Sequence, residues 1–183
     1  MMFDLLYFIM SKIIFAGGCF WGVQHYFKLV KGVTKTEVGY IGGHVPHPTY
    51  KQVKTGTTGH TEACLVNYDN QQTSLVKLLV HFFFIIDPTV LNRQANDIGT
   101  QYRTAIFYYT PREKELITNY ISGNIQPKYD KPIVVQVESA VVNQFWPAEE
   151  YHQYYLEKNP DGYCHLTKDT YNRCKYIDIN NNI

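Results

Sequence analysis

A single cysteine near the start of the chain stands between glycines and two large aromatic residues, in the segment Gly17-Gly-Cys-Phe-Trp-Gly22. The residues that follow are apolar at helical spacing, so we expect a helix to begin close to Cys19. The N-terminus of a helix offers free N–H groups and the positive end of the helix dipole, which favour a thiolate over a thiol. The segment therefore predicts a nucleophilic sulfur, and its glycines allow close approach of a ligand.

The same residues permit a plainer interpretation, in which Cys19 is a buried structural thiol and both rings belong to the core. Packing alone does not require three glycines around one cysteine, which favours the reactive alternative. Two consecutive side chains point to different sides of a helix. We therefore expect at least one of Phe20 and Trp21 to face the same cavity as the sulfur and to form an apolar wall for a small ligand.

Five further segments give the chain a resemblance to a known family. They are Gly39-Tyr-Ile-Gly-Gly43, Pro48-Thr-Tyr50, Gly59-His-Thr-Glu-Ala63, Asp87-Pro-Thr89 and Asn92-Arg-Gln-Ala-Asn-Asp-Ile-Gly-Thr-Gln-Tyr-Arg103. In order, and with the cysteine segment before them, they resemble peptide methionine sulfoxide reductase A, the MsrA family, over about Lys12 to His165. That family restores oxidised methionine. The resemblance implies an oxidoreductase, a peptide-methionine (S)-S-oxide reductase that acts on free or protein-bound sulfoxide and repairs proteins after oxidative stress.

The resemblance also implies a role for individual residues. Cys19 matches the nucleophile of the family, and Phe20 and Trp21 match the aromatic residues that bind the methyl group of the substrate. Glu62 matches an acid that donates a proton to the sulfoxide oxygen, as a carboxyl kept neutral by an apolar environment is able to do. The remaining matches are two hydroxyls that hydrogen-bond this oxygen and one further acid, namely Tyr50, Tyr102 and Asp97.

A second thiol is implied by the same chemistry. Attack by Cys19 leaves a sulfenic acid on its sulfur, and another thiol must clear it. Cys164, in Asn159-Pro-Asp-Gly-Tyr-Cys-His165, matches the resolving cysteine of the family, with thioredoxin as the implied reductant and no cofactor. Cys64 is interpreted as a core residue. Cys174, ten residues beyond Cys164 in a polar tail, is interpreted as a free thiol, with a shuttle role as the alternative.

Two positions depart from the pattern of the family. Ile86 stands where histidine or arginine is usual, and Ala95 replaces a glycine. We expect both departures to affect local packing rather than the chemistry.

Two other functions also remain open from the residues themselves. One is a cysteine hydrolase or acyltransferase with His60 or His152 as the base, which needs no second thiol. The other is a binding or redox-sensing domain without activity.

Composition sets the class of protein. The chain has 183 residues, a formal net charge of +1 and 15% aromatic residues, which predicts a folded protein with no signature for nucleic acid or a membrane. A monomer is expected because a repair enzyme must admit bulky substrates. Four scattered cysteines without a Cys-x-x-Cys pair indicate a reducing compartment, so we expect a cytoplasmic protein. The histidines and cysteines lack the spacing of a zinc site, and no metal is expected. The first residues are apolar but too short to span a bilayer.

The elements that position these residues follow from the spacing of apolar side chains. Strands are predicted over 13–16, 34–41, 61–68, 104–109 and 133–138, and helices over 19–30, 74–86, from Pro111 onward and over 148–156. This alternation predicts a mixed sheet with helices packed on it. The expected fold is α+β, a single-domain two-layer α/β sandwich with a ferredoxin-like core and a long irregular C-terminal segment. We expect residues 1–11 to be an N-terminal extension, 12–165 the reductase domain and 166–183 a polar C-terminal tail.

Overall fold

The structure, a computed structural model, describes residues 10–177. Six strands form the main sheet: β1 (Met10–Gly17), β2 (Val33–Ile41), β3 (Thr61–Asp69), β6 (Thr104–Tyr108), β7 (Gln136–Ser139) and β8 (Trp146–Pro147). Their order across the sheet is β7-β6-β1-β3-β2-β8. Neighbouring strands are antiparallel except β6 and β7, which are parallel, so the sheet is mixed as predicted. A separate hairpin contains β4 (Arg93–Gln94) and β5 (Asp97–Ile98).

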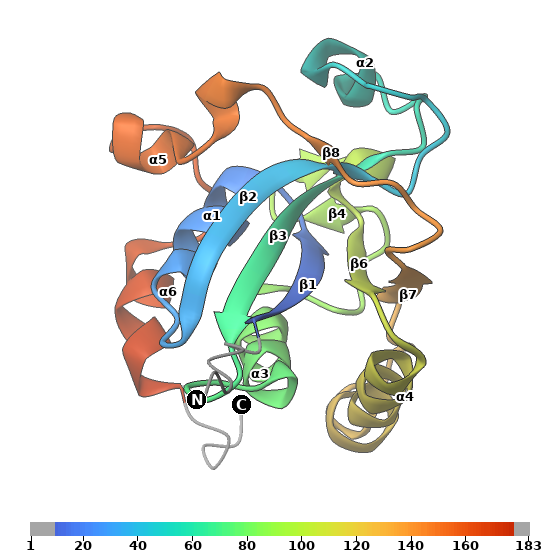
Figure 1. Cartoon of the computed structure of the whole chain (residues 1–183), viewed down its shortest axis with the longest axis vertical. Helices are drawn as coiled ribbons and strands as arrows, with labels where there is room; N and C mark the ends of the chain where they lie inside the picture. The colour runs from blue at the N-terminus through green and yellow to red at the C-terminus, as the bar shows by residue number, and fades with distance from the viewer. Residues whose placement is uncertain (1–9, 178–183) are drawn as a thin grey trace, which may run out of the picture.

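Helices surround this sheet: α1 (Phe20–Lys28), α2 (Tyr50–Lys54), α3 (Leu75–Ile85), α4 (Pro111–Tyr120), α5 (Tyr155–Lys158) and α6 (Lys168–Arg173). Shorter turns are η1 (Thr100–Tyr102), the π-helical η2 (Ile121–Ile125), η3 (Gln126–Lys128), η4 (Glu150–His152) and η5 (Cys174–Tyr176). Figure 1 shows β2, β3 and β1 side by side, with α1 against β2, α6 on the outer side of α1, and α4 beyond β6 and β7. No helix within residues 10–177 is long and apolar enough to cross a membrane.

The central strands have the order of a ferredoxin-like core. The chain runs β1-α1-β2 and then β3-α3-β6, while the strands lie in the order β6-β1-β3-β2. Each crossover helix therefore joins two parallel strands that have an antiparallel strand between them, which is the split βαβ arrangement. This topology confirms the predicted fold class. It also places the start of α1 and the start of β3 at the same end of the sheet.

The two faces of the sheet are covered differently. The larger core cluster lies under α1 and α3, where Phe15 stacks between Phe27 and Phe82 with ring centroids 4.8 and 4.7 Å away. A smaller cluster on the other face contains Ala63 and is covered by Phe145, from the connection between β7 and β8. Strand alternation explains the division, because successive side chains of β3 point to opposite faces.

Most predicted elements are confirmed, including the helix from Pro111 and the buried position of Cys64. The strand predicted over 133–138 begins only at Gln136. The short helices α2 and α6 were not predicted, because each depends on a threonine cap, Thr49 or Thr167, at the start of a polar segment. Ile86, one of the two departures, is 8% exposed and belongs to the larger core cluster.

The prediction of one helix over 148–156 is wrong. The structure has η4, then two non-helical residues, then α5. Gln153 explains the break, because its side chain accepts from the N–H of Val38 at 2.9 Å and donates to the C=O of Val38 at 2.8 Å. This double contact ties the chain to the edge of β2, and the next residue, Tyr154, has φ +54°. A continuous helix would carry the Gln153 side chain away from β2.

The C-terminal segment contains more structure than its polar composition predicts. Helix α6 begins at the cap Thr167 and leads into η5. Cys174, interpreted from the sequence as a free thiol in a polar tail, is 3% exposed and belongs to the larger core cluster. The thiol is free, as interpreted, but its position in a polar tail is wrong, because it lies against Tyr26 of α1 inside the fold. The segment that follows Cys164 is therefore anchored to the domain through residue 174.

Candidate active site

Cys19 is the N-cap residue of α1, as the sequence predicts, and it is 6% exposed. Strand β1 ends at Gly17, and Gly18 turns the chain with φ +86°, a conformation that side chains disfavour. A Cβ at Gly18 would also lie 2.8 Å from Cβ of Gln94, on the β4–β5 hairpin. Gly18 thus serves both the turn and the close packing of the hairpin beside the cysteine.

Glu62 lies on β3, directly below the first turn of α1, and is 2% exposed. Its Oε2 accepts a hydrogen bond of 3.1 Å from the backbone N–H of Phe20. Burial raises the pKa of Glu62 to about 8, the Phe20 N–H opposes this rise, and the charge of Asp97 adds to it. Because this pKa lies above neutrality, the carboxyl holds a proton at pH 7 and is able to donate it.

The pKa of the Cys19 thiol is raised well above its ordinary value. Burial is the largest cause and the nearby Glu62 the second, while the backbone N–H of Trp21 lowers the pKa. The sequence predicts that the helix start favours a thiolate. For the free protein this prediction is wrong, because burial raises the pKa of the thiol by more than the helix start lowers it. The resting site therefore contains two neutral, proton-bearing groups, a thiol and a carboxylic acid.

Phe20 and Trp21 build an aromatic wall beside the sulfur. Phe20 is buried, and its ring centroid lies 5.8 Å from Tyr40 of β2 and 5.1 Å from His152. Trp21 is half-buried and stacks on Tyr155 of α5, with centroids 3.8 Å apart and an interplanar angle of 12°. An apolar wall with one face half-open suits a small alkyl group attached to a longer chain.

His152 holds the wall together and was singled out in the sequence only as a possible base. Its Nδ1 accepts from Nε1 of Trp21 at 3.0 Å, and burial lowers its pKa, so the ring is neutral. This bond places the Trp21 indole. His60, the other candidate base, has both ring nitrogens engaged in its own loop, with the N–H of Gly43 at 3.1 Å and the C=O of Val45 at 2.7 Å. Both histidines therefore use ring nitrogens in structural hydrogen bonds, and neither is placed to act as a base.

Two tyrosine hydroxyls belong to the same site. Tyr50 begins α2, and its backbone N–H donates to Oε1 of Glu149 at 2.8 Å. Burial, followed by the charges of Glu62 and Cys19, raises the pKa of Tyr50 to about 12. Tyr102 ends η1, and burial followed by the charge of Glu62 raises its pKa too. Both hydroxyls therefore stay protonated at neutral pH and are able to donate hydrogen bonds.

Asp97, at the start of β5, accepts a hydrogen bond of 3.0 Å from the hydroxyl of Tyr163. Nδ1 of His165 lies 3.9 Å from its other carboxylate oxygen. Burial, followed by this hydrogen bond, raises the pKa of Tyr163 to about 12. Tyr163 and His165 were not singled out from the sequence, although they flank Cys164. Their contacts tie the segment around Cys164 to the hairpin beside Cys19.

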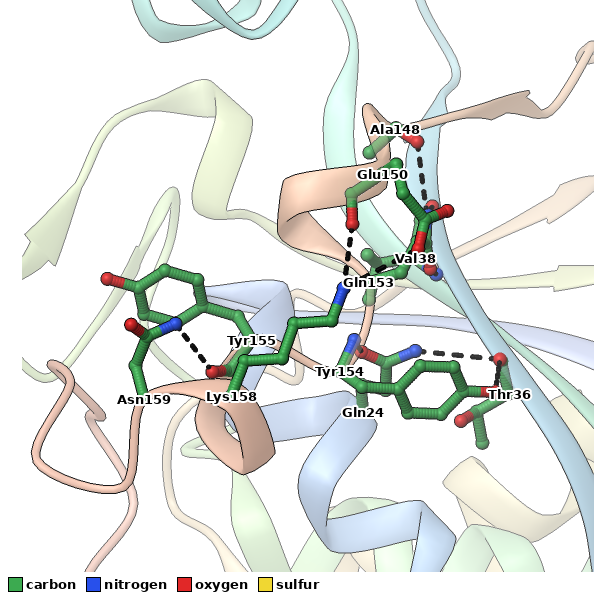
Figure 2. A network of polar contacts seen from close by, with 10 residues as sticks. All are labelled: Gln24, Thr36, Val38, Ala148, Glu150, Gln153, Tyr154, Tyr155, Lys158 and Asn159. Carbon is green, nitrogen blue, oxygen red and sulfur yellow. Dashed lines mark hydrogen bonds and ion pairs between the residues drawn. The ribbon is translucent and has the colours of Figure 1, made fainter.

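The segment that contains His152 and Tyr155, residues 148–159, is held by side chains, as Figure 2 shows. The backbone N–H of Tyr154 donates to Oε1 of Gln24 at 2.7 Å, and its hydroxyl donates to the C=O of Thr36 at 2.9 Å. The left-handed backbone of Tyr154 is costly for a tyrosine. It turns the chain so that the next ring, Tyr155, stacks on Trp21.

Cys164 lies over the first turn of α1. A Cβ at Gly22 would come within 3.1 Å of the Cys164 sulfur and 3.0 Å of the His165 ring, so the absence of a side chain at Gly22 makes room for this segment. A charge on Cys164 contributes to the raised pKa of Cys19, which places the two sulfurs in the same electrostatic environment. Both cysteines are free thiols. Every residue predicted for the site is thus found at this end of the sheet.

Comparisons with known proteins agree with this site. The sequence profile of the family described as peptide methionine sulfoxide reductase matches residues 11–179. A peptide methionine sulfoxide reductase MsrA of Mycoplasma pneumoniae is 51% identical over 160 residues, which are 87% of this chain and 100% of that protein. The crystal structure of Mxr1 from Saccharomyces cerevisiae in reduced form superposes with a TM-score of 0.78 and 35% identity, covering 85% of this chain and 88% of that chain.

A second structure of the yeast protein contains a partner. Mxr1 in complex with Trx2 superposes with a TM-score of 0.54 and 21% identity, covering 80% of this chain and 84% of that chain, a likeness that shows the fold alone. No group of three or more histidine, cysteine, aspartate or glutamate side chains within residues 10–177 is arranged to hold a metal ion.

Proposed function

The chain belongs to the peptide methionine sulfoxide reductase family, and we propose that Cys19 is the atom-transfer centre of its reaction, the reduction of methionine S-sulfoxide to methionine. The substrate ends in a methyl group beside a polar S=O bond. It requires a site that is half apolar and half hydrogen-bonding. Phe20 and Trp21 supply the apolar half, and the neutral Glu62 with the two tyrosine hydroxyls supplies the other.

The first step transfers oxygen from the substrate to the enzyme. The Cys19 sulfur attacks the sulfoxide sulfur while Glu62 gives its proton to the oxygen, which makes the S–O bond easier to break. Glu62 regains a proton from the Cys19 thiol, so the step neither gains nor loses protons. The attack forms a bond between the two sulfurs, and the hydroxyl then moves from the substrate sulfur to the Cys19 sulfur as that bond breaks, which leaves methionine and a sulfenic acid on Cys19. A thiol with a raised pKa suits this coupling, because its proton leaves as the acid beside it becomes a base.

Tyr50 and Tyr102 donate hydrogen bonds to the sulfoxide oxygen during this step. Their raised pKa values keep both hydroxyls protonated. Asp97 acts on the same region through its charge, which favours the protonated form of Glu62. Phe20 and Trp21 bind the methyl group and orient the sulfur toward Cys19.

The second step restores the reduced enzyme. The Cys164 sulfur attacks the Cys19 sulfur, hydroxide leaves with a proton as water, and a disulfide forms between the two cysteines. Thioredoxin then reduces this disulfide by thiol exchange. The yeast relative crystallised in complex with Trx2 supports a reductant of this class. Because the proposed cycle depends on reduced thiols, we place the protein in the cytoplasm, where it acts as a monomer on free and protein-bound sulfoxide.

The observation that carries this assignment is the contact between Glu62 and the first turn of α1. One backbone N–H, that of Phe20, links the buried acid to the residue directly after Cys19. The acid and the sulfur are therefore positioned by the same turn, and the aromatic wall begins there as well. A cysteine hydrolase would use a histidine as its base, and the two histidines considered for that role, His60 and His152, are engaged in other hydrogen bonds.

A single-turnover experiment tests the proposal. Reduced protein is mixed with a methionine S-sulfoxide peptide without reductant, and released methionine is measured together with trapping of the Cys19 sulfenic acid by a dimedone reagent. We expect one methionine per Cys164→Ser protein, a trapped adduct on Cys19, and no cycling with thioredoxin. Full thioredoxin-driven cycling of Cys164→Ser would contradict the role of Cys164, and methionine release by Cys19→Ser would contradict the role of Cys19.

A further inference from the structure

Two hydrogen-bonding groups converge on the sulfur of Cys164. The hydroxyl oxygen of Tyr171, on α6, lies 2.7 Å from Sγ, and the backbone N–H of Leu166 donates to the same sulfur at 3.3 Å. A thiol has a single proton of its own to donate, whereas a thiolate accepts several hydrogen bonds. Burial raises the pKa of Tyr171, so its hydroxyl keeps its proton and must be the donor whenever Cys164 is ionised. The Cys164 sulfur is therefore placed to accept two hydrogen bonds at once.

The Tyr171 hydroxyl is held by an element separate from the segment that contains Cys164. Thr167 caps α6 by accepting from the N–H of Thr170 at 3.2 Å. The Tyr171 ring meets the ring of His25 edge-on at 4.7 Å, and the Arg173 guanidinium lies 5.0 Å from the ring centroid of Phe84. With the buried Cys174 one turn further on, these contacts fix α6 against α1 and the core.

We propose that Tyr171 is a positioning residue for the second half of the reaction, holding the Cys164 sulfur over Gly22 and stabilising its thiolate before it attacks Cys19. This inference rests on the proposed role of Cys164 as the resolving thiol. In the step it assists, Cys164 loses its proton, an S–S bond forms, and the S–O bond of the Cys19 sulfenic acid breaks. The hydroxide that leaves takes up a proton to become water. Tyr171 supplies its hydrogen bond to Cys164 before the attack and is itself unchanged.

The first test measures how readily Cys164 ionises. The variant Tyr171→Phe keeps the ring against His25 and removes only the hydroxyl. In a Cys19→Ser background, alkylation of Cys164 by iodoacetamide is followed across pH by peptide mass spectrometry. A hydrogen bond to a charged group contributes about 1.5–3 kcal/mol, so we expect the pH of half-maximal alkylation to rise by about one unit or more in Tyr171→Phe. A loss of positioning alone would change the rate at every pH without moving that midpoint.

Other titratable groups that face the Cys164 sulfur or Tyr171 also affect the pH profile of alkylation. They are Cys19, His25, Tyr163, His165 and Tyr171. The Cys19→Ser background removes the first of these, and the others are the same in both proteins except at the substituted position. A matched control is Tyr120→Phe, which removes a hydroxyl from a half-buried tyrosine on α4 that packs against Phe83. We expect its alkylation profile to equal that of the parent.

The second test measures disulfide formation in the protein with both cysteines. A tenfold lower thiolate fraction is partly offset because a more basic thiolate is about threefold more nucleophilic, so we expect Tyr171→Phe to form the disulfide about threefold more slowly near pH 7. Release of methionine in the first step should keep its rate. An unchanged midpoint with an unchanged disulfide rate, or faster disulfide formation, would overturn the role of Tyr171. Failure of the proposed function is distinct, because it would appear in Cys164→Ser as continued thioredoxin-driven turnover.

Discussion

The two sulfurs of the proposed cycle are positioned in different ways. Cys19 lies between a central strand and a helix, and the backbone alone determines where it sits. Cys164 lies on a segment between α5 and α6 that is attached through side chains. The hydroxyl of Tyr163 hydrogen-bonds Asp97, and the hydroxyl of Tyr171 hydrogen-bonds the Cys164 sulfur. The difference matches the chemistry, because the attacking atom needs one fixed geometry. The second sulfur has to move from its hydrogen bonds to bond with Cys19 and afterwards meet a reductant.

The largest effect that we expect is on the first region alone, and it comes from replacing Glu62. Glu62→Gln keeps the shape of the side chain and its ability to accept from Phe20, but it has no proton to give. General acid catalysis contributes typically 10²–10⁴-fold, so the rate of methionine release in a single turnover should fall by about that factor. Alkylation of Cys164 should not change. A fall of less than about threefold in methionine release would show that Glu62 is not the acid.

The same residue gives the pH dependence of the first region. Methionine release should fall as pH rises through about 8, because Glu62 then loses its proton.

The stability of the protein should also depend on the ionisation of Glu62. The folded-state pKa of about 8 lies above the ordinary 4.5, so the unfolded chain releases this proton first, and the contribution of Glu62 to stability is lost as pH rises from 4.5 to about 8. The free energy of unfolding is measured by urea denaturation for the wild type and for Glu62→Gln. As pH rises from 4.5 to about 8, the value for Glu62→Gln should increase relative to that of the wild type. A difference that stays constant with pH would contradict the assigned pKa.

A smaller effect is expected in the segment 148–159, which supports the aromatic wall of the first region. His152→Phe keeps a ring at the same place but removes the acceptor of the Trp21 indole N–H. An unsatisfied buried donor costs about 1–3 kcal/mol, so we expect KM for a sulfoxide peptide to rise about tenfold, with a shift in Trp21 fluorescence. Tyr151→Phe, at an exposed neighbouring position, is the matched control. An unchanged fluorescence spectrum with unchanged KM would show that the indole is placed by stacking on Tyr155 alone.

Gly22→Ala tests the contact between the regions directly. The new Cβ would lie 3.1 Å from the Cys164 sulfur and 3.0 Å from the His165 ring, so the segment has to shift by a few tenths of an ångström. Alanine also favours the helix by about 1 kcal/mol. We expect unchanged or higher stability, unchanged methionine release, and disulfide formation slower by about threefold, measured by quenched alkylation. Equal slowing of both steps would mean that the substitution disturbs Cys19 as well.

The smallest effect concerns the hairpin that both regions contact. Ala95 has φ +49°, a conformation that costs a residue with a side chain about 1–2 kcal/mol and that glycine adopts freely. Part of the gain from Ala95→Gly is offset by the larger freedom of glycine in the unfolded chain. The net expectation is a free energy of unfolding higher by about 0.5–1 kcal/mol in urea denaturation, with both half-reactions unchanged. A loss of stability would show that the Ala95 methyl group makes compensating contacts.

The sequence was most informative where positions are set locally. Cys19 at a helix start and Glu62 on a strand follow from glycine placement and from the spacing of apolar residues. The neighbouring contacts could not be predicted, because they join residues far apart in the chain. Gln153 and Val38 are 115 positions apart, and Trp21 and His152 are 131 apart. The direction of the Cys19 pKa shift was also missed, since it depends on burial that only the folded protein reveals.

The contacts of Gln153 have a further consequence for a protein whose substrates are damaged polypeptides. Unfolded chains expose extended segments that add to open sheet edges and lead to aggregation. At the outer edge of β2, the amide of Gln153 occupies both the N–H and the C=O of Val38, and the hydroxyl of Tyr154 occupies the C=O of Thr36. Beyond them the sheet ends in the two-residue strand β8, which finishes in Pro147, a residue without an N–H. Near the repair site, the edge groups of Val38 and the C=O of Thr36 are thus already paired and are unavailable to an extended client chain.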